Sequence, residues 1–133
     1  MPFETNVPCV SSDFFSTIAE AVGLNLDDHR PLDGICLMPL SRQQTDERSR
    51  SIPFQFETQA ALSGNQFKLL NNSAVRRLSS DNGAAEVAVW ELYNLIKDSG
   101  ETINIAAEQP KVLSSMQAER TAWQDSLRNT LAE

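Results

Sequence analysis

The strongest structural signal in this sequence is an amphipathic stretch that begins at Pro110 and continues towards the end of the chain. Proline suits the first turn of a helix, because the amide hydrogen that it lacks has no intrahelical acceptor there. Apolar side chains then recur along one stripe: Val112, Leu113, Met116, Trp123, Leu127 and Leu131. Arg120 interrupts the stripe, and we expect its aliphatic stem to lie along the apolar surface. A long helix with one apolar stripe requires a second layer to cover that stripe.

Alternating side chains predict that this second layer is a β-sheet. Phe54 and Phe56 alternate with polar residues, which gives the first strand one aromatic face and one polar face. Pro53 indicates an edge strand, because proline cannot donate a hydrogen bond to a neighbouring strand. Two further strands, at 60–62 and 66–70, flank a short connection that contains glycine and asparagine. This pattern is typical of a β-hairpin.

A fourth strand is predicted at 87–93, with Trp90 and Leu92 on one of its faces. The preceding stretch, 71–85, is rich in asparagine and serine and predicts a long loop. Four short strands and one long helix indicate an α+β fold. We expect a small antiparallel sheet of about four strands packed against the C-terminal helix.

A second helix is predicted nearer the N-terminus, at about 12–22, and Gly23 is suited to end it. Phe14, Ile18 and Val22 recur within it at four-residue spacing. This spacing places them on one stripe, which we expect to be buried against a sheet or another helix.

The composition is typical of a soluble globular chain of one domain's length. There are 11 basic and 18 acidic side chains, so the net charge of −7 disfavours binding to nucleic acid or to anionic lipid. No apolar run reaches the roughly 18 residues that span a bilayer, and the N-terminal segment lacks the pattern of a signal peptide. We therefore expect no nucleic-acid partner and no membrane insertion.

The residue types that carry out catalysis are scarce. His29 is the single histidine, so this chain alone cannot form a multi-histidine metal site or a strong Ser-His-Asp triad. Cys9 and Cys36 lack the spacing of a zinc or redox motif, and whether they pair is left open. The five glycines, at 23, 34, 64, 83 and 100, form no phosphate-binding loop. No catalytic, cofactor-binding or metal-ligating residue is predicted in this chain.

Weaker patterns each have a simpler interpretation. Asp27 and Asp28 are acidic enough to contact calcium, but a solvated turn is favoured because no alternating acidic loop follows. Arg76 and Arg77 are basic enough to bind an anion, but solvated surface charge is the favoured interpretation. The sequon at 71–73 carries little weight without a secretory context. Core packing is favoured over a ligand platform for the two tryptophans, Trp90 and Trp123.

Taken in order, several segments resemble the C-terminal portion of a sulfatase of the arylsulfatase kind, in the alkaline-phosphatase-like superfamily. The matching segments are 10–15 (VSSDFF), 17–18, 23–24, 30–34 (RPLDG), 37–40 (LMPL), 52–54 (IPF), 60–69 (AALSGNQFKL), 90–93 (WELY), Asp98, 100–101 and 104–106. Together these segments extend over most of the chain. Asn94 and Ser99 depart from the family pattern, which commonly has aspartate and proline there.

The resemblance implies a catalytic cysteine or serine, matured to formylglycine in a Cys/Ser-x-Pro-x-Arg motif, near the start of a much longer chain. It also implies calcium-binding Asp/Asn side chains, and Lys and His groups around the sulfate. None of these motifs is present here: Pro39 lies one position too far from Cys36 to match. We therefore expect no cofactor in this chain, with calcium and formylglycine implied only for a missing N-terminal part. Family members are often exported, but the compartment of this chain is left open.

By analogy, residues 1–40 resemble the end of the catalytic α/β domain, with its last helix at about 12–22. Residues 41–51 are polar and predict an exposed linker, and 52–133 resemble the sulfatase C-terminal subdomain. The first hypothesis is therefore a fragment of a sulfuric-ester hydrolase that is inactive alone and pairs with an N-terminal catalytic portion. The alternative is a free-standing noncatalytic interaction module that uses an exposed apolar helix face. A small hydrolase that uses His29 is the least favoured hypothesis.

Overall fold

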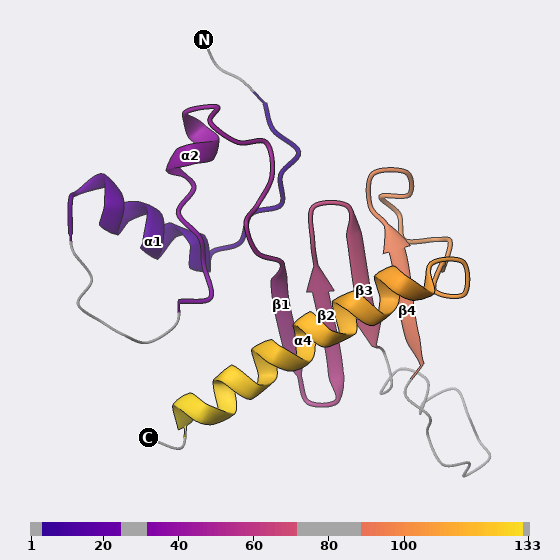
Figure 1. Cartoon of the computed structure of the whole chain (residues 1–133). Helices are drawn as coiled ribbons and strands as arrows, with labels where there is room; N and C mark the ends of the chain where they lie inside the picture. The colour runs from indigo at the N-terminus through magenta and orange to yellow at the C-terminus, as the bar shows by residue number, and fades with distance from the viewer. Residues whose placement is uncertain (1–3, 25–31, 72–88, 132–133) are drawn as a thin grey trace. The chain divides into compact units, whose positions relative to one another are not determined.

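The computed structural model describes residues 4–24, 32–71 and 89–131 (Figure 1). The chain divides into two compact units, Met1–Ile52 and Pro53–Glu133, and each is described by itself. The loop expected at 71–85 lies outside the described residues, except for Asn71, which ends a strand. Among the described residues, no helix is both long enough and apolar enough to cross a bilayer.

Unit 1 contains the helices α1 (Ser12–Ala21) and α2 (Met38–Ser41). The helix predicted at about 12–22 is confirmed to within one residue. Gly23 has a left-handed φ of 67°, and its amide donates to the carbonyl of Glu20 at 3.1 Å, so glycine ends α1 as expected. Pro39 occupies the first turn of α2, where its missing amide hydrogen has no cost.

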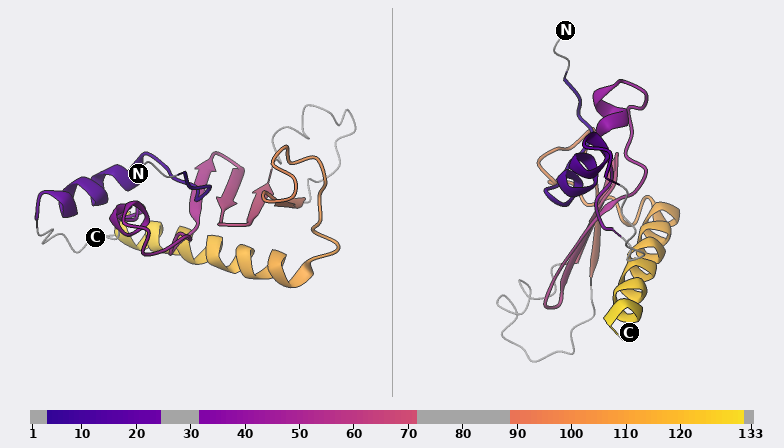
Figure 2. Two further views of the ribbon diagram at one scale, coloured as in Figure 1. Left: turned by 90° about the horizontal axis from the view of Figure 1, so that it is seen from above. Right: turned by 90° about the vertical axis from the view of Figure 1, so that its left-hand side faces the viewer.

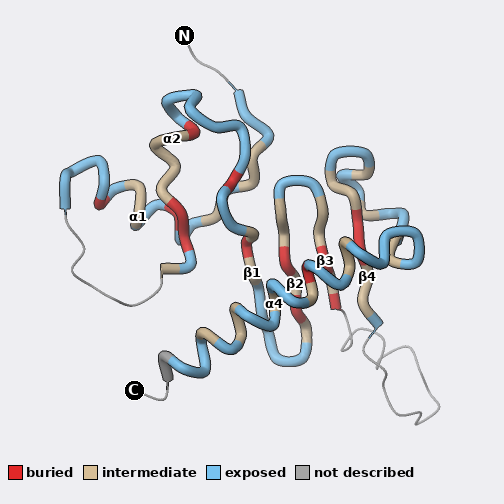
Figure 3. The backbone as a smooth tube through the Cα atoms, viewed as in Figure 1, coloured by how far each residue is buried: buried red, intermediate tan, exposed pale blue. Residues whose placement is uncertain are grey.

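The apolar stripe of α1 points outward, which corrects the expectation that it is buried. Phe14, Ile18 and Val22 are 60%, 60% and 70% exposed, whereas Asp13 and Ala19 are buried (Figure 3). The physical reason is that hydrogen bonds hold much of the inner side of the helix, where Asp13 and Ala19 are buried. The amide of Leu37, for example, donates to the hydroxyl of Thr17 at 2.9 Å. The amide of Ile35 likewise donates to the carboxylate of Asp13 at 2.9 Å.

Gly34 allows the chain to approach α1 closely. A Cβ atom at this position would lie only 2.1 Å from the carbonyl oxygen of Ser12, so any larger residue would force the two segments apart. The hydroxyl of Ser16 also donates to the carbonyl of Gly34, at 3.4 Å. The segment around Gly34 is therefore fixed along the polar side of α1.

Unit 2 contains a four-stranded sheet in the order β1-β2-β3-β4 and the long helix α4. The elements are β1 (Ile52–Phe56), β2 (Gln59–Ser63), β3 (Phe67–Asn71), β4 (Trp90–Asn94) and α4 (Pro110–Leu131). β3 pairs antiparallel with both β2 and β4. Helix α4 lies across one face of the sheet (Figures 1 and 2). The predicted α+β fold is confirmed.

The core of unit 2 is a row of three leucines that runs across the sheet. Leu62 pairs with Leu69, and Leu69 pairs with Leu92, in the strand register. These three side chains are 1%, 0% and 0% exposed and form one cluster with Met116 of α4. Six partly buried residues pack around this leucine row: Phe67, Trp90, Ile105, Ala106, Val112 and Leu113. The sequence placed Trp90 and Leu92 on one face of the fourth strand, and both lie at this core.

Of the two tryptophans, Trp90 lies against this core as predicted. Trp123 is half-buried and does not belong to the core cluster. The guanidinium carbon of Arg120 lies over the ring of Trp90, 5.1 Å from its centre. The arginine that interrupts the apolar stripe therefore stacks its charged group on an aromatic ring.

Candidate functional site

The most completely formed polar cluster in the described residues is a buried ion pair in unit 1. One nitrogen of the Arg48 guanidinium lies 2.8 Å from Oδ2 of Asp13, and the other lies 3.1 Å from Oδ1. The side chains are 1% and 0% exposed, respectively. This two-point arrangement matches the planar fork of arginine to the two carboxylate oxygens.

The remaining hydrogen-bonding atoms of this pair are bound to the backbone. Asp13 accepts hydrogen bonds from the amides of Val10 and Ile35, both at 2.9 Å. Arg48 donates to the carbonyls of Pro8 at 2.8 Å and Arg50 at 2.7 Å. The pair thereby ties together the segment before α1, the segment around residue 35 and the segment after α2.

These contacts determine the protonation of the carboxyl group. Burial alone would raise the pKa of Asp13, but the hydrogen bonds from Arg48, Ile35 and Val10 outweigh it and lower the pKa to about 2. Asp13 is therefore ionised throughout the physiological pH range and is closed off from solvent. Such a group cannot act as a general acid or base, because it neither exchanges a proton near neutral pH nor reaches a substrate. The Asp13–Arg48 pair is structural.

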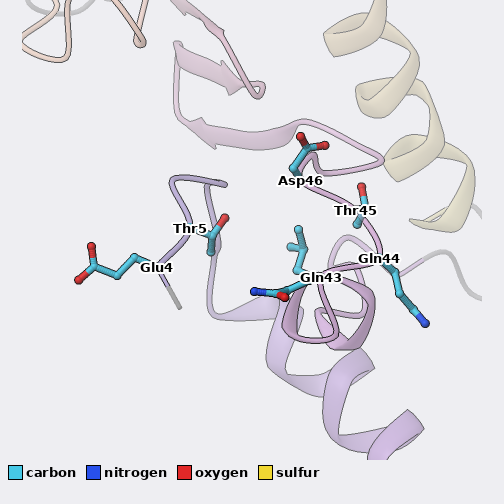
Figure 4. A pocket seen from close by; sticks show the side chains of 7 residues that line it. Glu4, Thr5, Gln43, Gln44, Thr45 and Asp46 are labelled. Carbon is cyan, nitrogen blue, oxygen red and sulfur yellow. The ribbon is translucent and has the colours of Figure 1, made fainter. Parts of the chain in front are cut away.

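A hollow of about 380 Å³ lies beside the turn that follows α2 (Figure 4). It is lined by Glu4, Thr5, Leu40, Gln43, Gln44, Thr45 and Asp46. Figure 4 shows that the carboxylates of Glu4 and Asp46 extend away from each other. They therefore do not converge on a cation, and the hollow has no nucleophile other than hydroxyl groups.

The thiol of Cys36 is also unsuited to catalysis. Cys9 and Cys36 are both free, so they do not form a disulfide. Burial and the neighbouring Glu20 raise the pKa of Cys36, which favours the unreactive thiol over the thiolate. Cys36 borders a second hollow, of about 340 Å³, together with Thr45 and Glu47. A thiol that holds its proton is a poor nucleophile and a poor metal ligand.

No group of three or more His, Cys, Asp or Glu side chains within 4–24, 32–71 and 89–131 is arranged to hold a metal ion. Several sequence candidates lie outside these described residues: Asp27, Asp28, His29, Arg76, Arg77 and most of the sequon at 71–73. The interpretations of those residues as solvated turns and surface charge stay predictions.

Unit 2 contains a third hollow, of about 360 Å³, at the end of the sheet where β4 leads into the following loop. Asp98 organises this loop by accepting hydrogen bonds from the amides of Thr102 and Ile103, both at 2.8 Å. These hydrogen bonds lower the pKa of Asp98. The carboxylate of Asp98 is already hydrogen-bonded to the backbone of this loop, so its role is to fix the conformation of the loop.

The comparisons with known proteins identify a fold. No family model matches the sequence, and no curated protein does so either. Several solved structures match the fold of the chain. A structure described as BT33336S-sulf, from work on glycosaminoglycan metabolism by Bacteroides thetaiotaomicron, matches 85% of this chain with 19% identity and a TM-score of 0.62. The structure of Ps i-CgsB matches 86% with 21% identity and a TM-score of 0.64.

A third structure, BT1596, described as a 2-O GAG sulfatase, matches 91% of this chain with 20% identity and a TM-score of 0.57. The resemblance to sulfatases stated from the sequence is therefore confirmed at the level of the fold. The chain spans only about a quarter of the length of these structures, from 24% to 26%. Unit 2 is less than two thirds of the chain, so matches of this extent include part of unit 1 as well.

Proposed function

We propose that this chain is the C-terminal portion of a sulfatase-like sulfuric-ester hydrolase and is inactive alone. The observation that carries the proposal is the match of 85–91% of the chain to about a quarter of several sulfatase structures. Residues 1–40 would then be the end of the catalytic α/β domain, 41–51 the linker and 52–133 the C-terminal subdomain. The exposed stripe of α1 supports this division, because a helix at the edge of an α/β domain covers a sheet with its apolar side.

The chemistry of the reaction explains why the chain needs a partner. Cleavage of a sulfate ester requires a nucleophile, positive charge near the sulfate oxygens and an acid for the leaving alcohol. The described residues do not fit this requirement: they include no group of three or more His, Cys, Asp or Glu side chains arranged to hold a metal ion, and burial favours the protonated thiol of Cys36. Formylglycine and calcium would therefore belong to an N-terminal catalytic portion. We assign no step of the reaction to residues of this chain.

The test is reconstitution of activity. We define the upstream polypeptide as the product of the reading frame immediately upstream, identified by a Cys/Ser-x-Pro-x-Arg motif. The purified chain alone should not hydrolyse an aryl sulfate in the presence of calcium, and the chain co-expressed with the upstream polypeptide should. Replacement of the motif's Cys or Ser by Ala is the matched control and should abolish the activity. Turnover by the chain alone, or the absence of such a reading frame in a finished genome, would contradict the proposal.

The second candidate function is a free-standing, noncatalytic interaction module. The observation that favours it is the exposed stripe of Phe14, Ile18 and Val22 on a helix whose other side is already packed. The two candidates differ in what the stripe binds. If the module hypothesis holds, the chain should bind another protein through α1 although no upstream polypeptide is encoded. Loss of that binding in Ile18→Ser, with the helix content unchanged, would assign it to α1.

A further inference from the structure

One face of the sheet of unit 2 is only partly covered by the described residues. The side chain of Gln55 in β1 accepts hydrogen bonds from Arg120 at 3.1 Å and from Gln124 at 2.8 Å, both in α4. Gln55 therefore faces the helix. Since side chains alternate along a strand, Phe54 and Phe56 face the other way. They are 53% and 70% exposed.

Two more apolar residues continue this face onto the neighbouring strands. Ala61 of β2 pairs with Leu70 of β3 in the register. Each adjoins a member of the leucine row, which faces α4, so both point to the side opposite the helix. Both are half-buried. We call Phe54, Phe56, Ala61 and Leu70 the aromatic face.

The chain itself closes the other end of the same side of the sheet. Lys68 and Tyr93 pair in the register and lie on this side. The amine of Lys68 lies 2.6 Å from a carboxylate oxygen of Glu101, in the loop after β4, and Tyr93 is buried. The exposed apolar side chains therefore lie towards β1, and Lys68, Glu101 and Glu91, which pairs with Leu70, border them on the other side.

We propose that the upstream polypeptide covers the aromatic face, so that in the complete protein the sheet is packed on both sides. This inference rests on the proposed function. The length of polypeptide outside the match supports it, because about three quarters of each matched sulfatase structure has no counterpart in this chain. Apolar side chains on one face of neighbouring strands, two of them exposed phenylalanines, are also typical of a surface that a protein interface buries.

A second copy of the chain is a poorer occupant for two reasons. Each copy carries a net charge of −7, so two copies repel each other. Pro53 in β1 has no amide hydrogen to donate, which weakens pairing of this edge strand with the strand of another copy.

Hydroxyl-radical footprinting tests the proposal by measuring the oxidation rate of individual phenylalanines. In the chain alone, Phe54 and Phe56 should be oxidised rapidly, at a rate that does not depend on protein concentration. In the complex with the upstream polypeptide, their oxidation should fall severalfold. Phe14 of α1 serves as a separate marker for docking of the upstream polypeptide to unit 1.

The possible outcomes separate the two proposals. If Phe14 becomes protected while Phe54 and Phe56 stay reactive, the inference about the aromatic face is overturned and the proposed function stands. If none of the three is protected, both proposals fail. If Phe54 and Phe56 are already oxidised slowly in the chain alone, the inference is overturned. A slow rate that does not depend on protein concentration would mean that the chain itself covers the face. A rate that falls with protein concentration would mean that a second copy covers it.

A variant provides the second test. Phe54→Ser with Phe56→Ser should weaken binding of the upstream polypeptide by at least about tenfold, as the loss of buried aromatic anchors does. The melting temperature of the chain alone should change little, because both side chains are exposed there. Leu127→Ser, at a partly exposed site on α4, is the matched control and should leave binding unchanged. Equal binding by the double variant and the control would contradict the proposal.

Discussion

The two units of this chain are stabilised in opposite ways. Four side chains are the largest fully buried ones among the described residues: three are the leucines of unit 2, and the fourth is Asp13 of unit 1. Unit 2 therefore has an apolar centre, whereas the centre of unit 1 is an ion pair and its main apolar stripe is exposed. The difference shows that unit 2 has an apolar core of its own, whereas the main apolar stripe of unit 1 is exposed.

The largest expected effect comes from removing one member of the buried ion pair. Asp13→Ala should destabilise unit 1 by about 3–5 kcal/mol, because it leaves the guanidinium of Arg48 buried without its counter-ion. Amide hydrogen exchange of α1 measures this loss. The double variant Asp13→Leu/Arg48→Met should recover only part of the loss, because it removes both charges but leaves the amides of Val10 and Ile35 without their acceptor. A single variant as stable as the parent would show that the pair does not hold unit 1 together.

In unit 2 the corresponding change is Leu69→Ala, at the centre of the leucine row. We expect a loss of about 2–5 kcal/mol in the free energy of unfolding, from the lost burial and the cavity that remains. Urea unfolding followed by tryptophan fluorescence measures it, because both tryptophans lie in unit 2. Leu70→Ala, on the half-buried side of the same strand, is the control and should cost clearly less. Equal losses would mean that α4 does not cover the leucine row.

The two units should also differ in their response to acid. The pKa of Asp13 in the folded state, about 2, lies below its ordinary value of 3.8. The ionised carboxylate therefore stabilises unit 1 above about pH 4, and this stabilisation, about 2 kcal/mol, is lost as the pH falls towards 2. Protection of α1 amides measured between pH 5 and pH 2 checks this. The leucine row has no titratable group, and the Lys68–Glu101 pair on β3 is partly exposed, so protection of β3 should fall less. An equal fall in β3 would contradict the assignment to Asp13.

The smallest effect is expected on the exposed stripe of α1. Phe14→Ser should change the free energy of unfolding of the chain alone by no more than about 0.5 kcal/mol, because most of the Phe14 side chain is already exposed to solvent in the folded state. Thermal unfolding of the chain provides the measurement, with Ala19→Ser, a buried position on the same helix, as the contrasting variant. A large loss from Phe14→Ser would show that the stripe is covered within this chain.

The sequence predicted unit 2 better than unit 1, for a physical reason. The hairpin at 60–70 and the terminal helix are local patterns, and their apolar positions meet each other within this chain, as Leu69 and Met116 do. The spacing of Phe14, Ile18 and Val22 correctly identified an apolar stripe on a helix. Periodicity does not reveal whether the partner of a stripe is present, so the expectation of burial was wrong.

The aromatic face presents the same difficulty at the scale of one strand. Alternation correctly separated Phe54 and Phe56 from Gln55, but it could not determine which side α4 would cover. The helix covers the polar side of this strand, because its own residues there, Arg120 and Gln124, are polar as well.

Arg48 was missed altogether. It lies in the polar segment 41–51, in which every other residue is exposed except the half-buried Ser51. Its partner, Asp13, is 35 positions away and was interpreted only as a first-turn acidic residue. No local pattern marks a buried pair of this kind. One available signal was Gly34, a position where the chain passes close to α1 and which therefore indicates a tightly packed site.

Residue-resolved hydrogen exchange of α1, with β3 as the internal reference, tests most directly whether unit 1 lacks its packing partner. In the chain alone, the amides of α1 should exchange clearly faster than those of β3, and binding of the upstream polypeptide should slow α1 far more than β3. Strong and equal protection of both elements in the chain alone would contradict the account, because α1 would then be complete without any further polypeptide.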